Sequence, residues 1–201
     1  MSVCTRRPHL MLIIGMACAL SGIASQPAMA WTLDNANSRL SFVSVKAGNI
    51  GEVHHFNMLE GDVDNDGSAR ITVQLASIDT LIPIRDDRMK AMLFETDIFP
   101  TATIDITLDN AALEALAPGQ MSAQKLSGVL QIKDRQLNFS TSVNAMRLSP
   151  DRLVVAALQP LVINAASLGL DAGLEQLREI AGLPSISQAV PVSFLLTFVQ
   201  E

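Results

Sequence analysis

The chain has 201 residues, and 14 Lys and Arg stand against 20 Asp and Glu, for a net charge of −6. With Arg6 and Arg7 of the N-terminal segment set aside, only 12 basic residues oppose the same 20 acids. This balance excludes nucleic acid as a partner and disfavours binding to an anionic membrane surface. Any lipid contact is therefore expected to be with a single extracted molecule.

The first thirty residues are predicted to be a secretory signal. A basic region at Arg6 and Arg7 is followed by an apolar run over residues 10–20 and by the small-x-small sequence Ala28-Met29-Ala30. We expect cleavage after Ala30, a periplasmic location and one domain over residues 31–201. An uncleaved anchor is the disfavoured alternative, because the apolar run is shorter than the roughly 20 residues that a span needs. No membrane span is expected to remain after cleavage.

Both cysteines, Cys4 and Cys18, lie in this predicted signal. The exported chain would then have no thiol and no disulfide, so its stability must come from its core. A length of 171 residues suits one such core. The sequence is compatible with an oligomer but indicates none.

Alternation of apolar and polar residues predicts about eight strands in the exported chain. The predicted strands cover residues 40–44, 56–63, 71–75, 102–108, 126–132, 137–143, 152–163 and 192–198. Turn sequences stand between several of them, at residues 64–67, 134–135 and 149–151.

The alternation stops between residues 79 and 94, where a charged amphipathic helix is predicted. Met89, Met92 and Leu93 have the spacing i, i+3, i+4, so one apolar stripe can pack on a sheet. The charged side chains of this segment would face water: Arg85, Asp86, Asp87, Arg88 and Lys90. Two further helices are predicted, over residues 111–117 and 171–181, and Gly182 is expected to end the second.

About eight antiparallel strands with few helices form either a sandwich or an up-and-down barrel. We favour an all-β, lipocalin-like, eight-stranded barrel with a few short helices, because closure removes the edge strands that an exported, disulfide-free chain would have to protect. The interior of such a barrel is either filled by its own side chains or holds one small ligand. The pattern leaves both outcomes open.

Metal sites have little support. Asp62, Asp64, Asp66 and Gly67 match the opening of a calcium loop, but Val73 stands where a bidentate Glu is needed, so a hairpin turn is expected.

Glu52 and His54 can share one face of a strand, while His55 points to the other face. Two ligands do not make a zinc site, so a polar contact at the barrel rim is expected instead.

No catalytic motif is present: there is no G-x-S-x-G elbow, no H-E-x-x-H, no thiol outside the predicted signal and no phosphate-binding glycine loop. Asp86 and Asp87 are neighbours on a helix and diverge, whereas catalytic carboxylate pairs must converge. We expect neither enzyme activity nor a cofactor. An enzyme acting on a lipid head group, through Glu52, His54, Arg85 or Asp86, is the weakest alternative.

Sequence elements spread along the whole exported chain carry a family resemblance. They are Trp31-x-Leu33-Asp34, Ser38-x-Leu40-x-Phe42, Phe56 with Gly61, Ile78-x-Thr80, Arg85-Asp86-x-Arg88-Met89, Phe94, Phe99-Pro100, Gly128-x-Leu130 and Val192-x-Phe194-x-Leu196. The chain resembles the YceI-like, or polyisoprenoid-binding, family of exported bacterial proteins. It departs from the common pattern at Asn37 and Ala47, where histidines are frequent, and residues 168–188 are elaborated as a lid or a packed helix.

The resemblance implies a lipocalin-like barrel that binds a long-chain isoprenoid amphiphile, such as a quinone or a polyprenyl phosphate, in its apolar interior. The side chains expected to surround the tail are Leu40, Phe42, Phe56, Ile104, Ile106, Leu130, Ile132, Phe139 and Phe194. The polar residues expected at the barrel mouth are His54, Arg85, Asp86 and Arg88. For the last three, helix capping and ion pairing are the main expectation and head-group contact the alternative. The competing function is a filled, non-binding barrel that serves as an envelope scaffold or partner protein.

Overall fold

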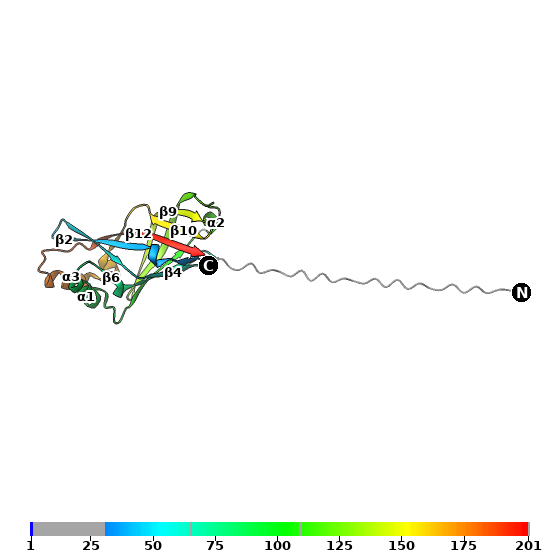
Figure 1. Ribbon diagram of the computed structural model, residues 1–201. Helices are drawn as coiled ribbons and strands as arrows, with labels where there is room; N and C mark the ends of the chain where they lie inside the picture. Colours follow the sequence, from blue (N-terminus) through cyan, green and yellow to red (C-terminus); the bar gives the residue numbers. More distant parts are fainter. Residues whose placement is uncertain (2–30, 65, 109, 201) are drawn as a thin grey trace.

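The computed structural model describes Met1 and residues 31–64, 66–108 and 110–200. In this part of the chain one antiparallel sheet closes on itself to form a barrel, drawn in Figure 1. The predicted secretory signal, its cleavage site and both cysteines lie outside the described residues.

Twelve strands are present in the described residues. Some of them lie in line in pairs, and each such pair forms one interrupted strand of the barrel. Their bounds are β1 Trp31–Leu33, β2 Arg39–Lys46, β3 Ile50–Phe56, β4 Leu59–Val63, β5 Ser68–Gln74, β6 Ile78–Asp79, β7 Thr101–Thr107, β8 Met121–Ile132, β9 Arg135–Ser149, β10 Arg152–Ala157, β11 Leu161–Asn164 and β12 Ala189–Gln200.

The pairings join these segments into eight strands. The ring β1-β4-β5-β7-β8-β9-β10-β12 is closed by the pairing of β12 with β1. β1 and β2 lie in line and both pair with β12, and so do β10 and β11. β4 pairs with β1 and β3 pairs with β2, so β3 and β4 together form the next strand of the barrel. Consecutive strands are neighbours throughout the ring. The prediction of an eight-stranded, antiparallel, up-and-down barrel is therefore confirmed.

The prediction of one continuous strand over residues 56–63 was wrong, because the backbone leaves the sheet at Asn57 and Met58. The Asn57 N–H donates to the Ser77 carbonyl at 3.0 Å, and the Met58 N–H donates to the Ser77 hydroxyl at 3.0 Å. The strand predicted over residues 152–163 is also broken. Pro160 lies in the gap between β10 and β11 and has no N–H to donate to a neighbouring strand.

The turn predicted at residues 64–67 joins β4 to β5. The Asp64 N–H donates to the Ser68 carbonyl at 2.8 Å, and Gly67 has a φ of +88°, a value that suits glycine. The Asp66 carboxylate accepts a hydrogen bond from the Ser68 N–H at 2.8 Å. This segment is thus a hairpin turn, as the sequence indicated.

The charged segment between β6 and β7 is helical, but it is not one regular helix. It consists of α1 (Pro83–Arg88) followed by the π-helix η3 (Met89–Phe94). Met89, Leu93 and Phe94 are the buried residues of η3. Phe94 was not part of the predicted α-helical stripe, and it reaches the buried face because the π turn is wider than an α turn.

Two further α-helices are present in the described residues. α2 (Asn110–Glu114) is shorter than the predicted helix over residues 111–117. α3 (Asp171–Ile180) is followed by Gly182 with a φ of +61°, as expected for a helix end. The short 3-10 turns are η1 (Asn35–Asn37), η2 (Leu75–Ser77) and η4 (Ala165–Leu168).

α3 packs directly on η3. A Cβ atom on Gly173 would lie 2.4 Å from the Met92 carbonyl oxygen and 2.8 Å from the Leu93 Cα, so only glycine permits this approach. In Figure 1, α1 and α3 gather at one end of the barrel, while α2 and the C-terminus lie at the other end. The segment 168–188 is thus in part a packed helix at one end of the barrel.

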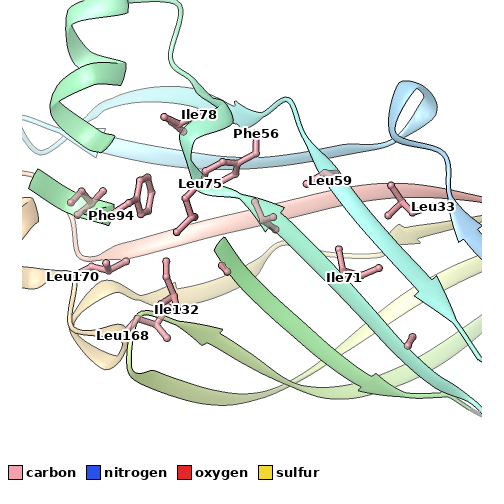
Figure 2. Close-up of a cluster of buried hydrophobic side chains, with 14 of the residues drawn as sticks. Leu33, Phe56, Leu59, Ile71, Leu75, Ile78, Phe94, Ile132, Leu168 and Leu170 are labelled. Carbon is pink, nitrogen blue, oxygen red and sulfur yellow. The ribbon is translucent and has the colours of Figure 1, made fainter. Parts of the chain in front are cut away.

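The core runs from the barrel wall to these helices. Figure 2 shows Leu33, Leu59 and Ile71 from the wall, and Phe94 and Leu170 from the helical end, within one cluster of buried side chains. The same end holds the mouth of the interior described below.

Candidate functional site

The barrel interior is hollow. It contains a cavity of about 790 Å³, a size typical of ligand pockets, which range from about 300 to 1,000 Å³. The lining consists mainly of aliphatic and aromatic side chains from the strands, together with side chains of α1, η3, η4 and α3. The side chains of this barrel therefore do not fill its interior completely.

All nine of the predicted tail-contacting side chains line this cavity: Leu40, Phe42, Phe56, Ile104, Ile106, Leu130, Ile132, Phe139 and Phe194. The strand register explains their common direction. Ile104 pairs with Leu130 and Ile106 pairs with Gly128 across β7 and β8, so alternate residues of both strands face inward together. Their contact with a lipid remains a prediction.

Gly128 has a packing role inside the barrel. A Cβ atom there would lie 2.5 Å from the Asp105 carbonyl oxygen and 3.0 Å from Cζ of Phe139. The absence of a side chain lets the Phe139 ring lie close over β8. The space that Gly128 leaves is therefore taken by Phe139.

An aromatic series lines the end of the cavity that is covered by helices. The ring of Phe42 lies 5.3 Å from the His54 ring, edge to face, and 5.7 Å from the Phe56 ring. Phe56 in turn lies 5.8 Å from Phe94 of η3. These separations are typical of favourable aromatic pairs. Phe42 and Phe56 were predicted on the lining from the sequence, but Phe94 was not, because its inward position depends on the π-helix.

Charged side chains line the cavity where β2 and β3 meet α1, and we call this end of the cavity its mouth. Lys46, Glu52, His54, Arg85 and Arg88 all line it, and we call these five residues the polar cluster. One Glu52 oxygen, Oε2, accepts hydrogen bonds from Lys46 Nζ at 2.9 Å and from Arg85 Nη1 at 2.8 Å. The hydrogen bond from Lys46 and the nearby Arg85 guanidinium hold the pKa of Glu52 below its ordinary value, against the opposing effect of burial.

His54 is the most buried member of the polar cluster, with an exposed fraction of 2%. Burial, and then the charge of Arg85, lower the pKa of His54 below its ordinary value of 6.5. The imidazole is therefore neutral at pH 7. Among the described residues, neither Nδ1 of His54 nor Nε of Arg85 has a hydrogen-bond partner. Buried polar atoms without partners are destabilising, which makes this corner a candidate position for a polar group.

Asp86 and Arg88 differ in their positions. Asp86 does not line the cavity: its Oδ1 accepts hydrogen bonds from the Thr80 N–H at 2.8 Å and from the Thr80 hydroxyl at 2.5 Å. Its role is the structural one that the sequence suggested, because it ties α1 to the segment before it. Arg88 lines the cavity and forms no ion pair with any described residue. His55 lies on the opposite face of β3 from His54, 3.5 Å from Asp79.

Lys46 and the contribution of residues 161–187 were not predicted from the sequence. Lys46 reaches the mouth because β2 and β3 extend beyond the closed ring. Leu170, Leu174 and Leu177 line the cavity from the chain around α3. The apolar stripe of α3 was visible in the sequence, but the surface that it covers was not.

Two features are absent from the described part of the chain. Within residues 31–64, 66–108 and 110–200, no three His, Cys, Asp or Glu side chains are grouped closely enough to hold a metal ion. In the same ranges, no helix has the length and apolarity that crossing a membrane requires.

Comparisons with known proteins agree with this architecture. The structure of a polyisoprenoid-binding domain from Saccharophagus degradans, implicated in plant cell wall breakdown, is similar to this one, with a TM-score of 0.84. The two sequences are 37% identical, and the match covers 86% of this chain and 99% of that chain. BcnA from Burkholderia cenocepacia is 22% identical, over 82% and 98% of the two chains, with a TM-score of 0.64, which shows the shared fold. No curated protein matches the chain.

The family comparison covers nearly all of the described barrel. Residues 31–198, from the start of β1 almost to the end of β12, match the YceI-like domain. This chain therefore belongs to the YceI-like family.

Proposed function

We propose that this protein binds a long-chain isoprenoid amphiphile, a quinone or a polyprenyl lipid, inside the barrel, as a periplasmic binding or carrier protein. The observation that carries the proposal is the apolar cavity of about 790 Å³, open at a mouth lined by charged groups. An amphiphile matches this division, with its tail among the apolar side chains and its head at the polar cluster. The similarity to a polyisoprenoid-binding domain at 37% identity supports the same ligand class.

The free energy of ligand transfer favours a protein that exchanges its ligand with a membrane over one that retains it permanently. Moving each CH₂ group of the tail out of water is worth about 0.8 kcal/mol, so a tail of several isoprene units would bind tightly from water. A bilayer offers the tail nearly the same environment as the barrel. Exchange between bilayer and barrel is then close to neutral in free energy, which permits both loading and release.

The test is native mass spectrometry of protein purified from its natural cell compartment without detergent, followed by organic extraction of whatever it carries. We expect one isoprenoid per chain, and the extract would identify its head group. Fractionation of the same cells would test the periplasmic location. An empty, folded protein that also refuses added quinones and polyprenyl lipids would refute the proposal and favour the scaffold function.

A further inference from the structure

One stretch of the barrel wall is not held by strand pairing. β9 pairs with β10 from Val143 onward, and at the end of this pairing the Leu158 N–H donates to the Ser142 carbonyl at 3.0 Å. The chain then passes through Pro160 into β11, and among the described strands β11 pairs with β12 alone. Residues 137–141 of β9 therefore have β11 as their next neighbour around the barrel but do not pair with it. We call the space between these two segments the lateral opening.

The cavity extends into the lateral opening. Strands that are paired along both edges contribute alternate residues to the lining, as β7 does with Ala102, Ile104 and Ile106. β9 and β11 instead contribute consecutive residues, namely residues 137–141 and all of Leu161–Asn164. Since successive side chains of a strand point to opposite faces, a strand that lines a space with both faces has its edge turned toward that space. The interior of the barrel thus continues between β9 and β11.

The lateral opening also reaches the outer surface. Asn138, Ser140 and Val162 line the cavity and are exposed at the same time, and Val162 is 62% exposed. Side chains that contact both the cavity and water mark the place where the two meet. β11 and β12 separate this place from β2, which carries Lys46 of the polar cluster. The cavity therefore has an opening in its wall in addition to the mouth.

The two openings differ in charge. The polar cluster lines the mouth, whereas residues 136–142 and 158–164, which border the lateral opening, include no charged residue. The apolar residues of these borders are Leu137, Phe139, Leu158, Leu161, Val162 and Ile163. A charged head group would lose its hydration there without gaining an opposite charge, while an aliphatic chain loses nothing. The lateral opening thus suits the tail of an amphiphile, and the mouth suits its head.

We propose that the lateral opening is the exit for the far end of the ligand tail, so that the protein binds amphiphiles whose tails are longer than the enclosed cavity. This inference rests on the proposed function, because it assigns a position to the tail of the same ligand. The affinity should rise roughly fourfold for each CH₂ group that the cavity covers. Groups beyond the opening return to water and add nothing. The affinity should therefore level off with increasing tail length, and the longest tails should still bind.

The first experiment uses the unmodified protein with farnesyl and nonaprenyl alcohols that carry a diazirine at the end of the tail. Native mass spectrometry measures binding, and peptide mass spectrometry after irradiation locates the crosslink. We expect both probes to bind, the farnesyl probe to label the interior, and the nonaprenyl probe to label residues 137–141 or 158–164. Nonaprenyl labelling confined to the interior, or at Ile82 and Ile84 of the mouth, would overturn the inference.

The second experiment places a bimane label on either side of the comparison, through Val162→Cys or Val53→Cys in a chain with Cys4→Ser and Cys18→Ser. The two valines are 62% and 63% exposed, and Val53 does not line the cavity. A nonaprenyl probe with a nitroxide at the end of its tail should quench the label at position 162 roughly threefold more strongly than the label at position 53. Equal quenching, or stronger quenching at position 53, would contradict an exit between β9 and β11.

The same probes distinguish this inference from the proposed function. Failure of the unmodified protein to bind either probe would refute the proposed function itself. Binding of the farnesyl probe together with exclusion of the nonaprenyl probe would leave the proposed function intact and overturn the lateral exit.

Discussion

A carboxylate placed inside the cavity provides a quantitative test of the binding site. Leu130 lies on β8 between Ile104 and Leu137 of the neighbouring strands and lines the cavity. Ser127 lies on the same strand and is exposed, with its hydroxyl 3.4 Å from that of Ser140. Leu130→Glu therefore changes the inner surface, and Ser127→Glu is the matched change on the outer surface.

The size of the effect follows from the proton that the buried carboxyl must take up. In the empty barrel water can hydrate the introduced carboxylate, whereas a bound tail removes that water and requires the neutral acid. Protonating at pH 7 a group whose pKa is about 4.3 costs about 3.7 kcal/mol. Dehydrating the neutral acid adds about 1–3 kcal/mol. The two effects together weaken binding roughly 10⁴-fold.

The assay is equilibrium binding of a short-chain fluorescent isoprenoid between pH 5 and 8, with folding checked by circular dichroism. We expect the affinity of L130E to improve about tenfold for each unit by which the pH falls, because one proton is taken up on binding. The affinity of S127E should match that of the unmodified protein. Equal loss in both variants, or a folded L130E protein with normal affinity, would refute the inward assignment of this face.

Two further predictions concern stability. The pKa of His54 is lowered in the fold, so as the pH falls the unfolded chain takes up the proton before the folded chain does. The contribution of neutral His54 to the free energy of unfolding is therefore fully present above pH 6.5 and is lost as the pH falls toward the lowered pKa. Melting temperatures between pH 7 and 5 should fall less steeply for H54Q than for H55Q, and identical slopes would contradict this. Gly173→Ala should lower the free energy of unfolding by about 1 kcal/mol, since overpacking against Met92 costs about 1–3 kcal/mol and helix propensity returns about 1. Urea denaturation measures this change, and an increase in stability would show that α3 can move.

The sequence determined the barrel because its information is local. Alternation places every second side chain on one face of a strand, and each hairpin turn sets the register of its two strands. The inward direction of Leu130 and Ile104 could therefore be predicted from the chain alone. The break at Asn57 could not be predicted, because it is stabilised by Ser77, which is distant in the sequence. The break before β11 did carry a local signal, because Pro160 has no N–H to donate to a neighbouring strand.

The polar cluster was only partly predictable. Glu52, His54, Arg85 and Arg88 carried a signal through their residue types and positions. Lys46 was missed, because it joins them only where β2 and β3 extend beyond the closed ring to meet α1. Asp86 resembles its charged neighbours in the sequence, yet its carboxylate accepts hydrogen bonds from Thr80 and does not line the cavity.

Whether the barrel is hollow was decided by the tertiary structure alone. The same inward-facing Leu, Ile and Phe residues can fill a barrel or line one, and the outcome depends on barrel radius and on the summed volumes of side chains from distant strands. In this protein about 790 Å³ is left open. By itself the sequence determined the all-β barrel, its alternating faces and its charge balance. The cavity and the shared carboxylate of Glu52 exist only where strands and helices distant in the sequence meet.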